Sequence, residues 1–139
     1  MYSTNHLSNI KVSLKKLKIL LVDDSIPILN KMKEILCEVK CIDTLDFATN
    51  AFKAYQMIDA EPPHLVLLDI NMPGKNGVEL LKEIKQNHPN VKVMMVTNQS
   101  VDYYKPICAE LGADYFIDKS TEFEMIPEII ENVCAEMSN

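Results

Sequence analysis

The sequence has no apolar run that approaches the length of a membrane-spanning helix, and its first nine residues hold no apolar signal core. It also lacks an excess of positive charge. The formal net charge is -6, which would repel the phosphates of a nucleic acid overall. These absences predict a cytoplasmic protein that binds neither a membrane nor nucleic acid directly. The length of 139 residues is that of one domain, and no internal repeat is present.

The cysteines and histidines follow no metal-site pattern. No CxxC and no zinc-site spacing occurs, and without a secretion signal a disulfide framework is not expected. We expect the cysteines to be small buried hydrophobic residues, because each falls in or beside an apolar stretch: Cys37, Cys41, Cys108 and Cys134. No histidine stands near another at ligand spacing, so surface or turn roles are predicted for His6, His64 and His88.

What the chain does have is a regular alternation of strand and helix patterns. The continuous apolar runs at 19–22 and 65–68 are typical of parallel strands buried on both faces. A further strand is predicted at 91–96, which is apolar except for Lys92. Shorter stretches at 44–47 and 115–117 bring the number of strands to five, each followed by a helical pattern. This predicts an α/β fold, a flavodoxin-like (βα)5 doubly wound parallel sheet. The mixed stretch 44–47 suits an edge, which gives the strand order 2-1-3-4-5.

Single residues mark the helix ends. Ser25 can cap the first helix, with Pro27 in its first turn, and Gly112 is a natural end for the fourth. Pro106 and Pro127 lie within the fourth and fifth helical stretches. Because each removes a backbone donor, those helices are expected to start late or kink.

Residues 1–17 are predicted to form an N-terminal arm that can be disordered, and residues 18–139 the folded domain. The end of the arm is rich in lysine. We interpret it as a solvated lead-in to the first strand, and a basic contact patch is the alternative.

Polar side chains stand where four of the strands end. Asp23 and Asp24 follow the first strand, Asp69 the third, Thr97 the fourth and Lys119 the fifth. In an open parallel sheet the site lies beyond the carboxyl ends of the strands, so these side chains should converge. Each has a structural explanation when taken singly, such as helix capping by an acidic pair. Their joint placement indicates a site.

Three clustered carboxylates repel one another, and a hard divalent cation such as Mg²⁺ would offset that repulsion. With Lys119 and Thr97 beside them, the site suits a cation plus a compact anion, best a phosphoryl group. A carboxylate can itself be the nucleophile and form an aspartyl phosphate, and Asp69 at the centre of the site is the best candidate.

At this point the sequence resembles a known family, the response-regulator receiver domains of bacterial two-component signalling. The resemblance rests on four ordered motifs that span about 17 to 134: "ILLVDDS" at 19–25, "LVLLDINMPGKNG" at 65–77, "VMMVTN" at 93–98 and "LGADYFIDKS" at 111–120. It implies a phosphoprotein of the stand-alone, single-domain type.

The resemblance also implies residue roles around the metal. Asp69 matches the phosphoacceptor. Asp23 and Asp24 match the acidic pair that holds Mg²⁺ or Mn²⁺, with Asp24 the more direct ligand. Asn71 would give its backbone carbonyl to the same ion.

A second set of roles concerns switching. Thr97 matches the switch hydroxyl, Lys119 the lysine that pairs with the phosphoryl group, and Phe116 the switch aromatic. Asn98 stands where a small residue is usual, and with Gln99 it is expected to tune access to the site.

The family takes phosphate from a phosphohistidine on a sensor histidine kinase or a phosphotransfer protein. It signals to a downstream target through the surface of its fourth helix, fifth strand and fifth helix. Such a domain is no enzyme in the ordinary sense, because it promotes only its own phosphorylation and dephosphorylation. Ser120 departs from the pattern, since proline, often in a cis bond, is usual after the lysine.

Three alternatives remain open. The first is a receiver that works without phosphorylation, as a protein-docking module. The second is a flavin-binding flavodoxin-like protein, although the acidic loop 23–25 would repel the flavin's phosphate. The third is a haloacid-dehalogenase-like phosphatase, which would need a second aspartate where Asn71 stands.

Overall fold

A five-stranded parallel sheet forms the centre of the protein. The computed structural model describes residues 16–138, so most of the predicted arm, including His6, lies outside the described residues. The strand order is β2-β1-β3-β4-β5, with every pairing parallel, as the sequence predicts. The strands are β1 (Leu17–Val22), β2 (Ile42–Ala48), β3 (Leu65–Leu68), β4 (Lys92–Thr97) and β5 (Tyr115–Asp118). β1 thus begins at the last residue assigned to the arm.

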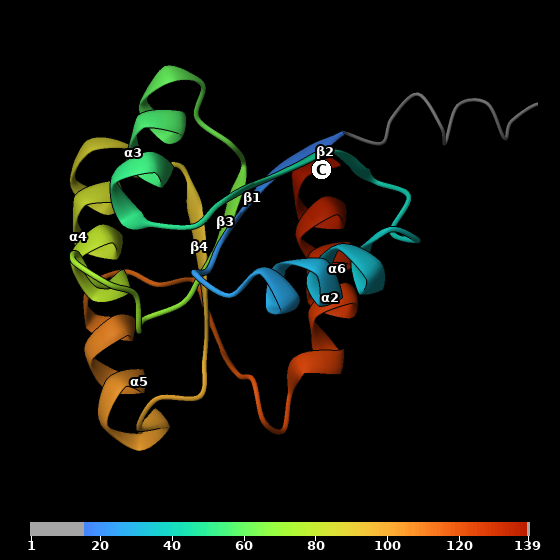
Figure 1. Ribbon diagram of the computed structural model, residues 1–139. Helices are drawn as coiled ribbons and strands as arrows, with labels where there is room; N and C mark the ends of the chain where they lie inside the picture. Colours follow the sequence, from blue (N-terminus) through green and yellow to red (C-terminus); the bar gives the residue numbers. More distant parts are fainter. Residues whose placement is uncertain (1–15, 139) are drawn as a thin grey trace, which may run out of the picture.

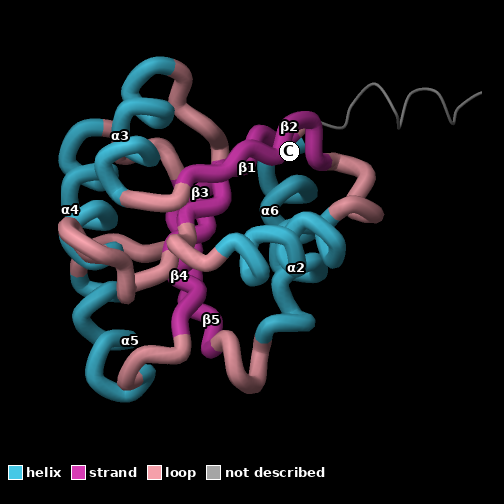
Figure 2. The backbone as a smooth tube through the Cα atoms, in the orientation of Figure 1, coloured by secondary structure: helices cyan, strands magenta, loops and turns pink. Residues whose placement is uncertain are grey.

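Helices cover both faces of this sheet. On one side lie α2 (Ile26–Leu36) and α6 (Ile126–Ser138), and on the other α3 (Ala51–Ala60), α4 (Gly77–Asn87) and α5 (Val101–Glu110) (Figures 1 and 2). A short 3₁₀ turn, η1 (Phe123–Met125), leads into α6. The doubly wound α/β fold is therefore confirmed.

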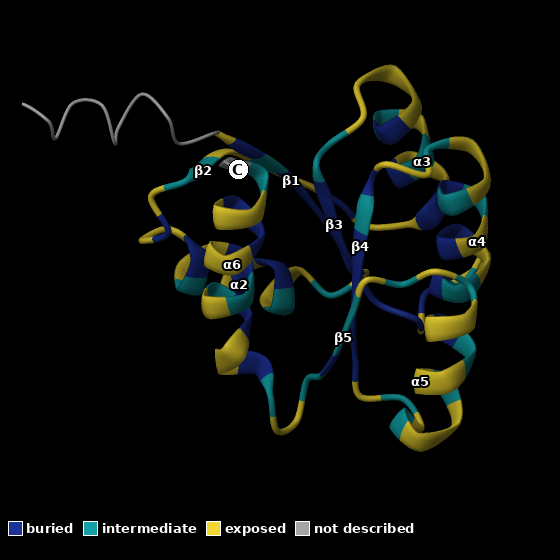
Figure 3. Ribbon diagram, turned by 180° about the vertical axis from the view of Figure 1, so that it is seen from behind, coloured by how far each residue is buried: buried dark blue, intermediate teal, exposed yellow. Residues whose placement is uncertain are grey.

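Two apolar layers hold the helices to the sheet. β1 alternates between them: Leu17, Ile19 and Leu21 pack under α2 and α6, whereas Leu20 and Val22 pack under the other helices. β3 is buried along its whole length, as its unbroken apolar run predicts, and Figure 3 shows the inner strands as the most buried part of the fold. β2 is mostly exposed, as expected for an edge strand.

The helix ends largely follow the sequence signals. The side chain of Ser25 accepts a hydrogen bond from the Ile28 N–H at 3.3 Å, and Gly112 adopts a positive φ of 101° just after α5. Pro127 lies in the first turn of α6, where its missing N–H costs no hydrogen bond. For Pro106 the late start, one of the two expected outcomes, does not occur, because this residue lies inside α5. Pro106 and Asp102 are exposed, so water can solvate the carbonyl that the proline leaves without a partner.

The expectation for the cysteines is wrong for three of them. Cys41, before β2, and Cys134, on α6, form a disulfide with Cα atoms 6.4 Å apart. Cys37 is exposed, and Cys108 alone is a free buried cysteine. The bonded pair is 93 residues apart in the sequence, so only the packing of α6 against the start of β2 brings it together.

Both described histidines have structural roles, as predicted. Nδ1 of His64 accepts a hydrogen bond from the Lys18 N–H at 2.9 Å, and His88 lies 3.1 Å from Asp59 on the neighbouring helix. Within residues 16–138, no helix has the length and apolar character needed to cross a membrane.

Candidate functional site

The backbone of the sheet brings the predicted site residues to one edge. The Asp69 N–H donates to the carbonyl of Val22 at 3.0 Å, which places Asp69 beside Asp23. On the other side, the Lys119 N–H donates to the carbonyl of Thr97 at 3.0 Å. Ladder hydrogen bonds therefore hold the ends of β1, β3, β4 and β5 in register, and the convergence expected from the sequence is present.

Three carboxylates form a tight cluster at this edge. One oxygen from each of Asp23, Asp24 and Asp69 lies within 4.8 Å of the others. Asp23 and Asp69 are buried, at 1% and 6% exposure, whereas Asp24 is exposed. Oxygen ligands at this spacing suit a hard divalent cation, and the exposed carboxylate leaves a path from solvent. The cluster fits the metal site that the sequence predicts.

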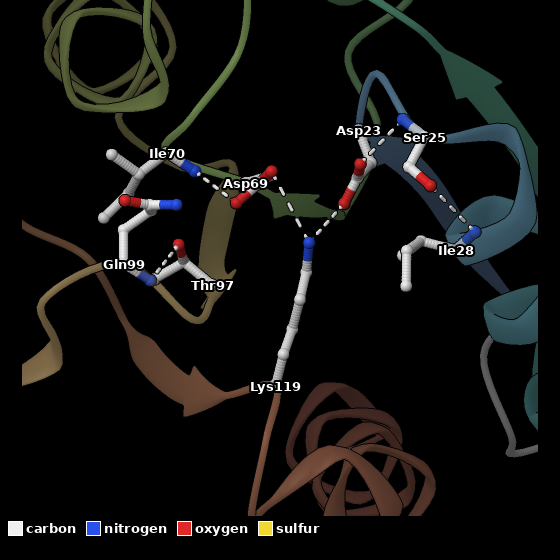
Figure 4. Close-up of polar contacts among 8 residues, drawn as sticks. All are labelled: Asp23, Ser25, Ile28, Asp69, Ile70, Thr97, Gln99 and Lys119. Carbon is white, nitrogen blue, oxygen red and sulfur yellow. Dashed lines mark hydrogen bonds and ion pairs between the residues drawn. The ribbon is translucent and has the colours of Figure 1, made fainter.

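Lys119 reaches into this cluster from the end of β5 (Figure 4). Its Nζ lies 2.7 Å from Oδ2 of Asp23 and 3.5 Å from Oδ2 of Asp69. The lysine side chain is only 12% exposed, so water screens these contacts little. One ammonium therefore faces two buried carboxylates and neutralises them incompletely.

The two oxygens of Asp69 differ in their surroundings. Oδ1 accepts the N–H of Ile70 at 2.8 Å, whereas Oδ2 faces Lys119 beyond the usual hydrogen-bond distance. Burial raises the pKa of the Asp69 carboxyl, and the charge of Asp23 adds to that effect. Lys119, the Thr97 hydroxyl and the Ile70 N–H oppose it without reversing it. The surroundings of Asp69 therefore disfavour its charged form, and its pKa is raised.

Thr97 is fully buried at the end of β4. Its hydroxyl oxygen accepts the N–H of Gln99 at 3.1 Å, and this contact ties the side chain to the start of the loop before α5 (Figure 4). Asn98 is exposed and Gln99 half-buried. The Thr97 hydroxyl therefore lies beside Asp69 and is also hydrogen-bonded to the loop between β4 and α5.

The remaining predicted residues lie around this centre. Phe116 is half-buried on β5, in register with Met95, and packs against the apolar layer under α3, α4 and α5. Asn71 is exposed in the loop after β3. Ser120 donates both its N–H and its hydroxyl to Oδ1 of Asp118, at 2.9 and 2.7 Å. These bonds lower the pKa of Asp118 and fix the turn after Lys119 without a proline.

Gly77 is a site residue that the sequence reasoning did not single out. A Cβ atom at this position would overlap the carbonyl oxygen of Asp69, and the Gly77 N–H donates to the Ile70 carbonyl at 2.8 Å. A capping box between Asn76 and Glu79 fixes the start of α4 at the same point. The absence of a side chain lets α4 pack directly behind the Asp69 backbone. The sequence signal that could have identified Gly77 is its place as the last residue of the 65–77 motif.

Comparison with known proteins identifies the family. The model of the response regulator receiver domain matches residues 19–131. The chain belongs to this family. The receiver interpretation of the sequence is thereby confirmed, in preference to the flavin-binding and phosphatase alternatives.

Individual relatives agree with this. The chain is 42% identical over 102 residues to a transcriptional regulatory protein CpxR homolog from Haemophilus influenzae, covering 73% of this chain and 43% of that protein. It therefore spans less than half the length of that relative. A CheY-like receiver domain protein from Methanospirillum hungatei is 30% identical, with a TM-score of 0.78 over 88% of this chain and 96% of that one. The Mn²⁺-bound form of response regulator Rcp1 is 27% identical, with a TM-score of 0.71 over 84% and 91%.

Proposed function

We propose that this receiver domain accepts a phosphoryl group on Oδ2 of Asp69, from a phosphohistidine on a sensor histidine kinase or a phosphotransfer protein. The observation that carries this is the arrangement of three clustered carboxylates around one lysine, with Oδ2 of Asp69 held only loosely. Asp69 is buried next to Asp23, so its negative charge is unfavourable while no further positive charge is present. A bound cation, together with a phosphoryl group on Asp69, would remove this unfavourable interaction.

Asp23, Asp24 and Asp69 would hold Mg²⁺ or Mn²⁺, with the backbone carbonyl of Asn71 as a further ligand. The cluster is made of hard oxygen donors, and the similarity to an Mn²⁺-bound response regulator supports the choice of ion. When bound, the ion would neutralise the carboxylates and stabilise the charge that develops on the phosphoryl oxygens.

The transfer itself needs few groups. Oδ2 of Asp69 attacks phosphorus, the new O–P bond forms, and the P–N bond to the donor histidine breaks, so the imidazole leaves with that electron pair and takes up a proton. Lys119 then moves its ammonium from the carboxylate to a phosphoryl oxygen. In this account the domain promotes only its own phosphorylation and dephosphorylation, and Asn98 and Gln99 tune the access of donor and water.

The signal would leave the site through Thr97. Its hydroxyl can donate to a phosphoryl oxygen, and the bond from the Gln99 N–H couples that movement to the loop before α5. Phe116, packed on the next strand, would respond by a change of rotamer. Phosphorylation thereby biases a two-state surface of α5, β5 and α6 for a downstream target protein. We place this function in the cytoplasm and assign it to the folded domain 18–139.

The test is intact mass after incubation with Mg²⁺ and acetyl phosphate. We expect a gain of one phosphoryl group in the wild type, none in Asp69→Asn, and none when a chelator is in excess over the metal. Asp69→Asn keeps the shape of the side chain, so circular dichroism should show an unchanged fold.

A phosphorylation-independent docking module is the second candidate, favoured by the exposed Asn98 and by Ser120 after the lysine. It is supported if a phosphohistidine donor also fails to label the wild type. Labelling of Asp69→Asn to the wild-type level would instead overturn the assignment of Asp69.

A further inference from the structure

The disulfide between Cys41 and Cys134 is the one covalent cross-link within residues 16–138. It joins the residue just before β2 to the C-terminal part of α6, across a sequence separation of 93 positions. The two bonded residues lie at the rim of the apolar layer under α2 and α6, far along the strands from the acidic cluster. Nothing in the proposed phosphoryl transfer uses this bond.

The bond joins two segments, β2 and the end of α6, each of which packs against the rest of the domain on one side only. β2 is an edge strand, paired only with β1. α6 is anchored by Ile126, Ile130 and Val133, all fully buried, but the residues after Cys134 are more exposed. Ile42 and Met137, the apolar neighbours of the two cysteines, are only partly buried. The cross-link therefore acts at a margin of this layer where neighbouring apolar side chains are only partly buried.

We propose that Cys41 and Cys134 form a reversible redox modification site, which locks the end of α6 to the start of β2 when it is oxidised. The remainder of the layer holds many buried side chains that do not depend on the bond, so the reduced domain stays folded. Reduced Cys134 would then be a small buried hydrophobic residue. In reducing compartments, disulfides of this kind are transient and regulatory rather than permanent staples.

The two sulfurs differ in access. Cys41 is half-buried, whereas Cys134 is only 4% exposed, so an incoming thiolate reaches Cys41 first. A thiolate of a dithiol reductant attacks Sγ of Cys41, the S–S bond breaks, and Cys134 leaves as a thiolate that takes up a proton. The second thiol of the reductant then attacks the mixed disulfide, releasing Cys41 as a thiol and the reductant as a cyclic disulfide.

The free cysteines provide internal references. Cys37 is exposed, four positions before Cys41 in the sequence, and reacts in either redox state. Cys108 is buried on the opposite face of the sheet, and burial raises the pKa of its thiol, so it is a poor partner for exchange. The Cys37→Ser variant is thus a matched control that removes an accessible thiol without touching the proposed site.

The experiment is a redox titration of the full chain. The native protein is equilibrated in buffers of graded dithiol and disulfide ratio, quenched with acid, unfolded, and alkylated with a maleimide of defined mass. We expect two reactive thiols at the oxidising end and four at the reducing end, because two of the four cysteines are free in the oxidised form. The change should occur at one midpoint, and Cys37→Ser should show the same midpoint with one thiol fewer.

Measurements of the Tm and of amide hydrogen exchange show whether the bond stabilises the domain and protects the two segments that it joins. Reduction should lower the Tm by about 5 °C or more, since a long closed loop strongly restricts the unfolded chain. It should also speed amide exchange in residues 41–45 and at the end of α6 more than in β3. The double variant Cys41→Ser, Cys134→Ser should show the Tm and the amide exchange of the reduced wild type in every buffer.

Three results would overturn the proposal: four reactive thiols even at the oxidising end, two that stay protected at every dithiol concentration, or a full change in thiol number with no change in Tm. All of these are read on the wild type, so the conclusion does not depend on the double variant folding. None involves phosphorylation, so the outcome is independent of the proposed function.

Discussion

At the amino end of the sheet two acidic side chains each pair with a lysine of their own, whereas at the carboxyl end one lysine faces two of three clustered carboxylates. Glu61 lies 2.8 Å from Lys18, and Asp114 lies 2.8 Å from Lys85 while also accepting the Val93 N–H. At the other end Lys119 faces both Asp23 and Asp69, with Asp24 close by. In the two pairs at the amino end the charges are balanced, whereas the clustered carboxylates at the carboxyl end outnumber their lysine. The difference agrees with a stabilising role for the two pairs at the amino end and with the ligand site that we propose at the carboxyl end.

The largest expected effect comes from the glycine that lets α4 approach Asp69. Gly77→Ala would place a Cβ atom against the Asp69 carbonyl, so the backbone must shift, and we expect a loss of about 3 kcal/mol or more in the free energy of unfolding. Phosphorylation of Asp69 should fall with it. Urea denaturation measures the first effect and intact mass the second.

Gly74→Ala is the matched control. Gly74 lies in the loop just before α4 and has a φ of 78°, but its Cβ would meet nothing within 4 Å. The expected cost is only about 1 kcal/mol from the left-handed backbone. Equal losses in the two variants would contradict the packing role of Gly77.

Removing Lys119, at the carboxyl end, should lower the free energy of unfolding more than removing Lys18, at the amino end. Lys119→Met leaves buried Asp23 without its cation, and we expect a loss of about 2 to 3 kcal/mol. Lys18→Met removes a partner of Glu61, which is 74% exposed, and should change the stability little. The two variants are compared by urea denaturation in metal-free buffer. A similar loss in both would remove the distinction between the two ends.

A divalent cation should stabilise the carboxyl end. At a Mg²⁺ concentration ten times its Kd, the free energy of unfolding should rise by about 1.4 kcal/mol. Asp24→Asn should weaken this gain, whereas Asp114→Asn, at the amino end, should leave it intact. Titration with Mg²⁺ during thermal unfolding measures all of these. An equal response in Asp24→Asn and the wild type would place the ion elsewhere.

The smallest expected effect is the pH dependence of Asp69. Its pKa is raised in the folded state, so the folded protein binds more protons than the unfolded chain between the ordinary aspartate pKa and the raised value. The contribution of Asp69 to stability therefore decreases as the pH rises through that window, and stays low at neutral pH. Asp69→Asn should be more stable than the metal-free wild type at pH 7, with the difference vanishing toward acidic pH. A variant less stable at pH 7 would contradict the pKa direction.

Most of the site could be predicted because its residues follow from position alone. Asp23, Asp69 and Lys119 each stand directly after a strand, and Thr97 is the last residue of one. Parallel strands bring such positions to one edge. The strand order followed in the same way from the alternating pattern and the mixed edge strand.

The features that escaped prediction depend on contacts between elements. The Cys41–Cys134 bond joins residues 93 positions apart, so no spacing rule finds it. The role of Gly77 depends on how closely α4 passes the Asp69 backbone. Pro106 was expected to delay or kink its helix. It lies inside α5, which is exposed at that point, so water can satisfy the carbonyl that the proline leaves free.

The central claim is that the carboxyl end carries the phosphoryl group on Asp69 itself. Borohydride reduces an aspartyl phosphate to homoserine, so it marks the modified residue permanently. The protein is treated with Mg²⁺ and acetyl phosphate, reduced with borohydride, digested, and sequenced by mass spectrometry. We predict homoserine at position 69, with Asp23, Asp24 and Asp114 unchanged. Homoserine at another aspartate, with position 69 intact, would contradict the account.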